Sequence, residues 1–217
     1  MRLGGNVHLY NYFRSSAAFR LRIALNLKGM DYGSTSIHLT KDGGKQFEAG
    51  FRAVNPQMRV PALKLDDGTI LLQSLAIIEY IDEVAPQPPL LPKDPVARAQ
   101  VRAVSQIIAC DIHPLNNTSP LTYLRKQMKQ DEAAVNAWYQ HWVIAGLDAI
   151  EALLPGSTYA FGNQVTLADV CLVPQLYNAR RFKVDLAKYP KIVAADAACQ
   201  KLPAFEQAKP ENQPDAE

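Results

Sequence analysis

In the first third of the chain, some segments have the alternation of apolar and polar residues that is typical of a strand, and others have the spacing of a helix. Val7–Tyr12 predicts a short strand, after which apolar residues recur at helical spacing up to Gly29, a residue suited to a left-handed helix end. Ser16 is the predicted N-cap of this helix. A second extended run, Ser34–Leu39, completes a β-α-β unit with an expected right-handed crossover.

Residues 40–85 continue this alternation of strand and helix. Residues 40–56 are polar with scattered aromatics and predict a short helix with irregular flanks. Two apolar runs around Asp66-Asp67-Gly68 predict a hairpin, and a helix is expected from Ser74 to about Val84. The order β-α-β-(α)-β-β-α is that of a thioredoxin-like domain.

A proline-rich stretch divides the chain. Ala85–Pro95 has five prolines in eleven residues, which sustain neither a helix nor an interior strand. The predicted division is a thioredoxin-like domain over 7–85, a linker over 86–95 and an all-helical domain over 96–217. Within the last part, helices are expected at about 96–115, 120–129, 131–153, 166–179 and 190–201, and the tail after Lys209 is expected to fray.

The second half contains one complete helix start signal. Thr166-Leu-Ala-Asp169 has the pattern of a capping box, in which the threonine caps the helix and the acid reaches back to it. A catalytic role for Asp169 is therefore disfavoured, and a structural role is expected.

Composition excludes several functional classes. The 217 residues are 48% apolar without a membrane-length apolar run, and 23 basic against 21 acidic residues indicate neither a nucleic acid nor a membrane partner. The opening MRLGGNV has no apolar core typical of a secretory leader. The three cysteines, Cys110, Cys171 and Cys199, fall in apolar helical stretches and are expected to be buried in a reducing, cytoplasmic protein. The four histidines lack metal-ligand spacing, so no metal is expected.

Six segments, in order, resemble the zeta class of glutathione transferases, which includes maleylacetoacetate and maleylpyruvate isomerases. They are YFRSSAAFRLRIALNLKG (12–29), NPQMRVPAL (55–63), QSLAIIEYI (73–81), LLPKDP (90–95), CDIHPLNN (110–117), and TLADVCLVPQ with ARRFKVDL (166–175, 179–186). The resemblance implies the glutathione transferase fold, glutathione as cofactor and a symmetric homodimer.

Glutathione is a flexible anionic tripeptide, so its site needs an extended backbone, donors for two carboxylates and a donor beside the thiol. By resemblance, the Val60 backbone, before a cis-proline, binds the cysteinyl part, while Gln73 and Ser74 hold the γ-glutamyl carboxylate at a helix start. His38 and Gln57 match positions that line this site. From the residues alone, Ser74 is also explained as an N-cap and His38 as a partly exposed strand-end residue.

A glutathione thiol, with a pKa of roughly 8.5 when free, needs stabilisation to ionise near neutral pH. Ser15 and Ser16 lie at the predicted strand-to-helix turn, where hydroxyls, free amides and the positive helix end converge. The resemblance makes Ser15 the principal donor to the sulfur and Ser16 a supporting one, although both are also explained as plain caps. Ala17 stands where the family often has cysteine, so glutathione is the only nucleophile expected there.

Arginines are suited to planar, bidentate recognition of carboxylates. Arg14, beside the serine pair, and the Arg180-Arg181 pair match places where the family holds the acid groups of its substrate, and Arg181 is the assigned one. Arg20 and Arg22 are expected to face solvent on the first helix.

CDIHPLNN supplies further polar groups. His113 and Asn116, with Asn117 beside them, are candidates for orienting a polar diacid. The alternative is an ordinary helix end at Pro114, flanked by capping residues.

These residues favour one function among three. The favoured function is glutathione-dependent isomerisation of a dicarboxylic maleyl-type diketo acid to its fumaryl isomer, in the catabolism of aromatic amino acids or other aromatic compounds. The alternatives are a transferase that conjugates or dehalogenates small electrophiles, and a non-catalytic binding module. Maleylacetoacetate and maleylpyruvate both remain open as substrates, because CDIHPLNN resembles the maleylpyruvate branch and FRSSAAFR the maleylacetoacetate branch.

Overall fold

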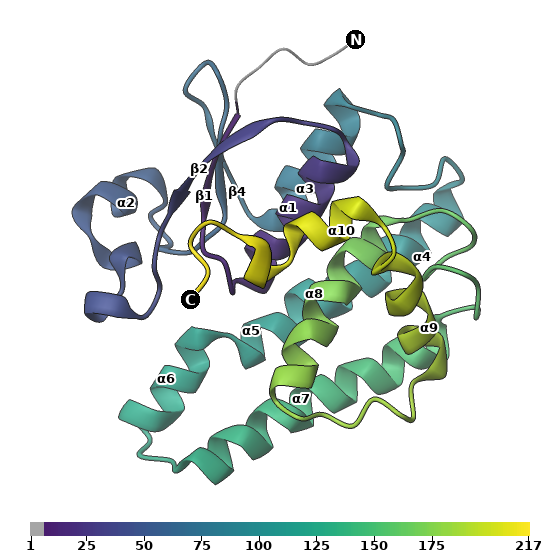
Figure 1. The fold of residues 1–217 in the computed structure, drawn as a ribbon. Coiled ribbons are helices and arrows are strands. Elements are labelled where there is room, and N and C mark those ends of the chain that lie inside the picture. The colour runs from purple at the N-terminus through teal and green to yellow at the C-terminus, as the bar shows by residue number, and fades with distance from the viewer. Residues whose placement is uncertain (1–6) are drawn as a thin grey trace. The chain divides into compact units, whose positions relative to one another are not determined.

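The computed structural model describes residues 7–217, which Figure 1 colours along the chain. The interpretation of the leader therefore lies mostly outside the described residues. The described chain forms two compact units, one ending at Pro89 and including Lys201–Glu217, the other spanning Leu90–Gln200. This differs from the division predicted from sequence, which placed residues 201–217 with the helical domain.

The first unit is built around a four-stranded mixed sheet. Its elements are β1 (Val7–Asn11), α1 (Ser16–Leu27), β2 (Tyr32–Ser36), α2 (Ala49–Val54), β3 (Ala62–Lys64), β4 (Ile70–Leu72), α3 (Ser74–Val84) and α10 (Pro203–Ala208), with short 3₁₀ turns at Lys41–Gly43, Lys45–Phe47 and Pro210–Asn212. The strand order is β2-β1-β3-β4, with β1 parallel to β2 and antiparallel to β3. The predicted order of elements up to Val84 is confirmed.

Two element starts differ from the sequence prediction. Ser15, and not Ser16, caps α1, because Ser15 has extended backbone angles and its hydroxyl oxygen accepts the Ala18 N–H. The second strand begins at Tyr32, two residues before the predicted start, because it pairs in register with β1 from Val7 onward.

The end of the chain is ordered against α1, which Figure 1 shows in purple beside the yellow α10. The Asn26 side chain donates to the Ala204 carbonyl at 3.0 Å, and Arg22 donates to the Ala208 carbonyl at 2.9 Å. The tail was predicted to fray. That prediction is wrong, because the Asp215 carboxylate in the tail accepts the Phe13 N–H and the Ser36 hydroxyl, which lie far away in the sequence.

The second unit is helical throughout its regular structure. It contains α4 (Pro95–Gln106), a π-helix (Ile107–Ile112), α5 (His113–Asn116), α6 (Thr118–Lys126), α7 (Glu132–Leu153), α8 (Leu167–Arg181) and α9 (Pro190–Cys199). A bidentate ion pair of 2.6 and 2.9 Å from Arg125 to Glu132 joins α6 to α7. The capping box of Thr166 and Asp169 is present as predicted.

The single helix predicted over 96–115 is interrupted by the π-helix. Gly146 of α7 makes room for it, since a Cβ at this position would lie 2.2 Å from the Ile112 Cδ1 atom. π-helical turns are frequent at functional sites, and this one leads directly into His113.

The cysteines agree with the prediction in two of three cases. Cys171 and Cys199 are buried, and burial, the largest cause, raises the pKa of the Cys199 thiol. Cys110 is exposed, so its predicted burial is wrong. Within residues 7–217, no helix is long and apolar enough to cross a membrane, and no group of three or more His, Cys, Asp and Glu side chains could hold a metal ion.

Candidate functional site

The start of α1 presents the hydroxyl that was predicted to face the thiol. The Ser15 N–H donates to the Tyr12 carbonyl at 3.0 Å, and the Ser15 hydroxyl oxygen accepts the Ala18 N–H at 3.2 Å. Accepting this bond uses a lone pair and leaves the hydroxyl proton able to donate elsewhere. Ser15 is half-buried, whereas Ser16, the first residue of α1, is buried. Ser15 is thus the better placed of the two to meet a ligand.

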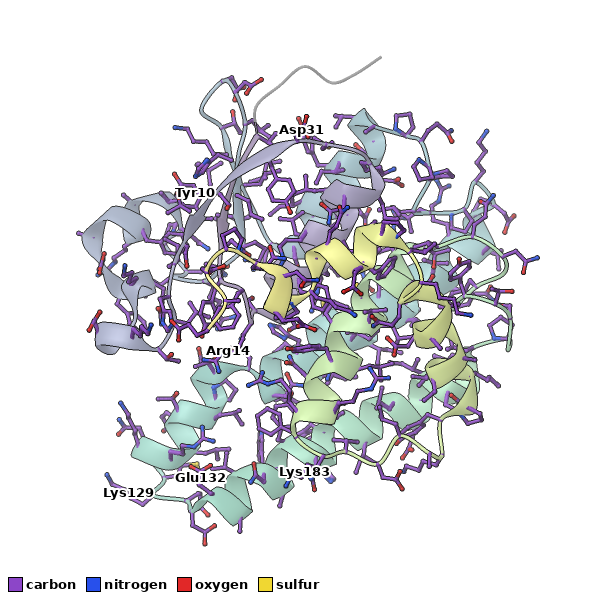
Figure 2. All side chains as sticks on the ribbon, in the orientation of Figure 1. Tyr10, Arg14, Asp31, Lys129, Glu132 and Lys183 are labelled. Carbon is purple, nitrogen blue, oxygen red and sulfur yellow. The ribbon has the colours of Figure 1, made fainter. Side chains whose placement is uncertain are left out.

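Arg14 is anchored beside Ser15 by an aromatic side chain that sequence reasoning missed. Its Nε and Nη2 groups donate to the Tyr12 hydroxyl at 3.1 and 2.8 Å, and its guanidinium lies 5.1 Å from the centre of the Phe13 ring. Figure 2 labels Arg14 in the loop between β1 and α1. The predicted substrate arginine is therefore held in place before any ligand arrives.

Gln57 and Gln73, predicted separately as cofactor contacts, lie together. The Gln73 amide donates to the Gln57 side-chain oxygen at 2.8 Å. Asn55 fixes the loop that carries Gln57, because its side chain donates to the Arg59 carbonyl and accepts the Gln57 N–H. This loop leads into Val60, whose peptide bond to the following proline is cis, as predicted.

The Gln73-Ser74 step has an unusual backbone. Gln73 has a φ of 68°, a left-handed value that costs a non-glycine residue roughly 1–3 kcal/mol, and functional sites are one place where such strained residues cluster. Ser74 begins α3, and its hydroxyl oxygen accepts a 3.4 Å hydrogen bond from Arg20. Arg20 is only 2% exposed, so the prediction that it faces solvent is wrong.

His38 lies just beyond β2 with its ring tautomer defined by the backbone. Its Nδ1 atom accepts the N–H groups of Lys41 at 2.9 Å and Thr40 at 3.3 Å, which places the ring proton of the neutral form on Nε2. Nε2 lies 3.2 Å from a Glu217 carboxylate oxygen, and Lys41 also pairs with Glu217. The His38 ring stands edge-on to Tyr12 with centroids 4.9 Å apart, so it lies near the Ser15 loop.

In the second unit, Asn116 is buried and its amide lies 3.5 Å from the Gln175 side-chain oxygen of α8. The Gln175 amide nitrogen is buried without a hydrogen-bond partner in the described chain. Asn117 caps α6, as the alternative reading of this segment expected, while His113 begins α5. The helix-end alternative holds only in part, because Asn117 caps α6 whereas Pro114 lies inside α5, and the role of His113 and Asn116 in orienting a diacid stays a prediction.

The two neighbouring arginines of α8 have different surroundings. Arg180 donates to the buried Asp196 carboxylate at 2.5 Å. Arg181 is exposed and makes a long 3.3 Å bond to Asn178, with its guanidinium 5.9 Å from the Phe182 ring centre. Arg180 is held in an ion pair with Asp196, so Arg181 is the one better able to bind a carboxylate.

The structure thus brings the predicted residues of the first unit into two groups. One joins Arg14, Ser15 and His38 through Tyr12, and the other joins Gln57 to Gln73 and Ser74. Sequence reasoning missed Tyr12, whose oxygens accept bonds from Arg14 and Ser15, and the burial of Arg20, which donates to Ser74. In the second unit it missed Gln175, the partner of Asn116, because the two residues lie 59 positions apart in the sequence. Tyr12 lies three residues before Ser15, and this short separation was a local signal for its role.

Comparison with known proteins agrees with both units. Residues 14–84 match the N-terminal domain of glutathione S-transferase, and residues 132–196 match its C-terminal domain. Maleylacetoacetate isomerase of Pseudomonas aeruginosa is 50% identical over 207 residues, with 95% of this chain and 97% of its own covered. Maleylpyruvate isomerase of Ralstonia sp. is 52% identical over 213 residues, with coverages of 96% and 99%.

Solved structures give the same result. A holo maleylpyruvate isomerase, described as a bacterial zeta-class glutathione S-transferase, superimposes with a TM-score of 0.93 at 51% identity, covering 97% of this chain and all of that one. Maleylacetoacetate isomerase of Methylobacterium extorquens, solved with bound malonate and glutathione, has a TM-score of 0.92 at 38% identity, with coverages of 97% and 99%. The chain belongs to the glutathione S-transferases. Within them it belongs to the zeta class of maleylacetoacetate and maleylpyruvate isomerases.

Proposed function

We propose that this protein converts a maleyl-type diketo acid to its fumaryl isomer with glutathione as the nucleophilic cofactor. The protein is a glutathione-dependent isomerase of the maleylacetoacetate and maleylpyruvate isomerase family. The observation that carries the chemical proposal is the Ser15 hydroxyl at the start of α1, which is oriented by its Ala18 bond with its proton still able to donate.

Ser15 stabilises the thiolate in this proposal. A hydroxyl donor and the positive end of the helix dipole both favour a negative charge at this point. Ser16 supports it through its backbone. Because Ala17 offers no sulfur, the thiolate of glutathione is the nucleophile.

The remaining cofactor contacts follow the chemistry of the tripeptide. Gln73 and Ser74 bind the γ-glutamyl carboxylate at the start of α3, and Gln57 orients Gln73 through their shared hydrogen bond. Val60 pairs its backbone with the cysteinyl part, and His38 lines the site. Support comes from solved relatives with glutathione bound.

The reaction needs an activated double bond and loses no atoms. The thiolate adds to one carbon of the double bond conjugated to a carbonyl, and the electron pair moves to that oxygen as an enolate. The former double bond is then single and rotates, after which the enolate expels the thiolate and restores the double bond in the trans form. Glutathione is regenerated with each turnover.

The carboxylates of the substrate would be bound by arginines. Arg14 and Arg181 are the assigned clamps, with His113 and Asn116 orienting the diacid; binding both ends also stabilises the enolate. Relatives solved with dicarboxylate ligands, malonate in one of them, support a diacid substrate.

The decisive experiment is turnover of maleylacetoacetate and maleylpyruvate, each with and without glutathione. We expect isomerisation that depends on glutathione and leaves its concentration unchanged. Net consumption of glutathione with halogenated or aromatic electrophiles, without isomerisation of either diacid, would instead favour a conjugating transferase. The ratio of the two isomerase rates identifies the substrate.

We also propose a symmetric homodimer in the cytoplasm. Phe47 and Val96 are exposed at 60% and 67%, so each is a position at which a partner surface can be tested. The free state of all three cysteines supports a reducing compartment.

A further inference from the structure

Arg22 is a buried cation whose role the sequence did not reveal. It was expected to face solvent on α1, yet its residue exposure is 0%. Its three hydrogen bonds reach neutral oxygens: Nε to the Ala208 carbonyl at 2.9 Å, Nη1 to the Asn11 amide oxygen at 2.8 Å and Nη2 to the Phe13 carbonyl at 3.0 Å. Burial lowers the pKa of Arg22 to about 10, which still leaves it charged at neutral pH. Burying a charge costs free energy, and an apolar side chain would fill the same space without that cost, so a further role of Arg22 is expected.

Both backbone polar groups of Phe13, its carbonyl and its N–H, are hydrogen-bonded to side chains. The Phe13 N–H donates to the Asp215 carboxylate at 3.2 Å. The two bonds belong to different peptide groups, one before and one after the Phe13 Cα atom. Together they hold the peptide planes that define φ and ψ of Phe13.

Asp215 ties this loop to the sheet as well. The same carboxylate oxygen accepts the Ser36 hydroxyl at 2.6 Å, and Ser36 is the last residue of β2. Asp215 is also close enough to Arg22 to act against the effect of burial on its pKa. The Asp215 carboxylate thus binds the N–H of Phe13, and the Arg22 guanidinium binds its carbonyl. Both residues belong to the unit that carries Ser15.

The loop fixed in this way carries the group that matters for the thiol. The peptide group whose N–H is held by Asp215 also contains the Tyr12 carbonyl, which accepts the Ser15 N–H at 3.0 Å. The next peptide group, held by Arg22, leads through Arg14 into Ser15. A rotation of either plane would therefore move the Ser15 hydroxyl, whose donor strength falls steeply with misalignment.

We propose that Arg22 and Asp215 are positioning residues that orient the Ser15 hydroxyl through the Phe13 backbone and thereby control how far bound glutathione is ionised. This rests on the proposed function, in which Ser15 donates to the glutathione sulfur. Neither residue touches the cofactor in this arrangement. The C-terminal segment becomes part of the catalytic apparatus, although it lies 202 residues from Phe13 in the sequence.

The test is the pKa of the thiol of enzyme-bound glutathione, measured by pH titration of the ultraviolet absorbance of its thiolate. In Asp215→Ala and Arg22→Lys we expect this pKa to rise by about 0.5–1 unit, with roughly a three- to tenfold loss of kcat. The KM for glutathione should change by less than about twofold, since no contact to the tripeptide is lost. Asp215→Asn keeps an acceptor oxygen and should restore part of the loss.

Glu211→Ala is the matched control, because Glu211 is an exposed acid of the same terminal segment. It should leave the thiol pKa and kcat unchanged. Thermal denaturation of each variant distinguishes unfolding of the protein from displacement of the Ser15 hydroxyl in a folded protein. If Arg22→Lys does not fold, Asp215→Ala still tests the proposal.

Ser15→Ala separates failure of this inference from failure of the proposed function. If Ser15→Ala raises the thiol pKa and Asp215→Ala does not, the positioning role is overturned while the proposed function stands. If the unmodified enzyme does not lower the thiol pKa, or Ser15→Ala leaves it unchanged, the Ser15 step of the proposed function fails and the inference fails with it.

Discussion

Gln57 and Gln73 share a side-chain hydrogen bond of 2.8 Å that joins the loop after α2 to the start of α3. The bond orients an amide at the point where Gln73 adopts a left-handed backbone, φ 68°. Two groups predicted to contact glutathione independently therefore form a single pre-arranged surface. A surface that is arranged in advance lowers the ordering cost of binding a flexible peptide.

Removing one member of this pair should weaken cofactor binding without affecting the chemical step. In Gln57→Ala we expect the KM for glutathione to rise roughly three- to tenfold, the loss of about one hydrogen bond, with kcat within about twofold. Steady-state kinetics with varied glutathione measure this. Gln127→Ala, an exposed glutamine of the other unit, is the control. An unchanged KM would mean that Gln73 needs no support from Gln57.

Ser15→Ala should affect both activity and stability, because Ser15 is also the N-cap of α1. Turnover is expected to fall at least about tenfold with the loss of a donor to the thiolate, and the free energy of unfolding by about 1 kcal/mol with the loss of the cap. Kinetics and urea denaturation measure the two effects separately. Ser15→Thr keeps a hydroxyl and should retain most of both, and full activity in Ser15→Ala would assign the sulfur contact to Ser16 or the backbone amides.

Arg181 distinguishes isomerisation of a diacid from conjugation of a neutral electrophile. Arg181→Ala should reduce the isomerase reaction by roughly 2–4 kcal/mol of transition-state stabilisation and leave conjugation of a neutral aromatic halide nearly unchanged. Both rates are measured on the same preparation. Equal losses in the two reactions would show that Arg181 supports glutathione binding or the fold.

The control for Arg181 follows from the ion pair of its neighbour. Arg180→Ala would leave the buried Asp196 carboxylate without its partner and lower stability, so Arg180→Lys is the better comparison. This variant should isomerise at close to the normal rate. A larger loss in Arg180→Lys than in Arg181→Ala would transfer the carboxylate contact to Arg180.

Gly146→Ala should destabilise the protein by about 1–3 kcal/mol, because its Cβ would overlap the buried Ile112 side chain. Chemical denaturation measures the change. Gly50→Ala in α2 is the matched control: nothing lies within 4 Å of its Cβ, and alanine should stabilise that helix by up to about 1 kcal/mol. Equal stability of the two variants would mean that the π-helix can move away from α7 at little cost.

The proposed homodimer predicts a sedimentation mass of about twice 24.0 kDa at micromolar concentration. Charge substitution of the exposed Val96, as Val96→Glu, tests whether this residue lies in the interface. A mass near that of a single chain for the unmodified protein would contradict the dimer.

The sequence by itself determined the elements whose signals are local. The helix over Ser74–Val84, the hairpin around Gly68 and the capping box of Thr166 all follow from period, turn chemistry and residues three apart, and the structure confirms them. The positions of the assigned site residues were available for the same reason, since Ser15, Val60 and Gln73 lie at the ends of such elements. The resemblance to the family then supplied their expected roles. A polar residue at a strand or helix end can be assigned a binding role only when the ligand it would bind is known.

Tertiary structure decided everything that depends on partners far apart in the chain. Arg22 has the local pattern of a solvent-facing arginine, yet three oxygens from β1, its following loop and α10 surround it. The terminal segment has the composition of a frayed tail, but its Asp215 carboxylate accepts hydrogen bonds from the Phe13 N–H and the Ser36 hydroxyl. Burial of a charge is a property of the assembled surroundings and not of the neighbouring residues, so no local pattern carries it.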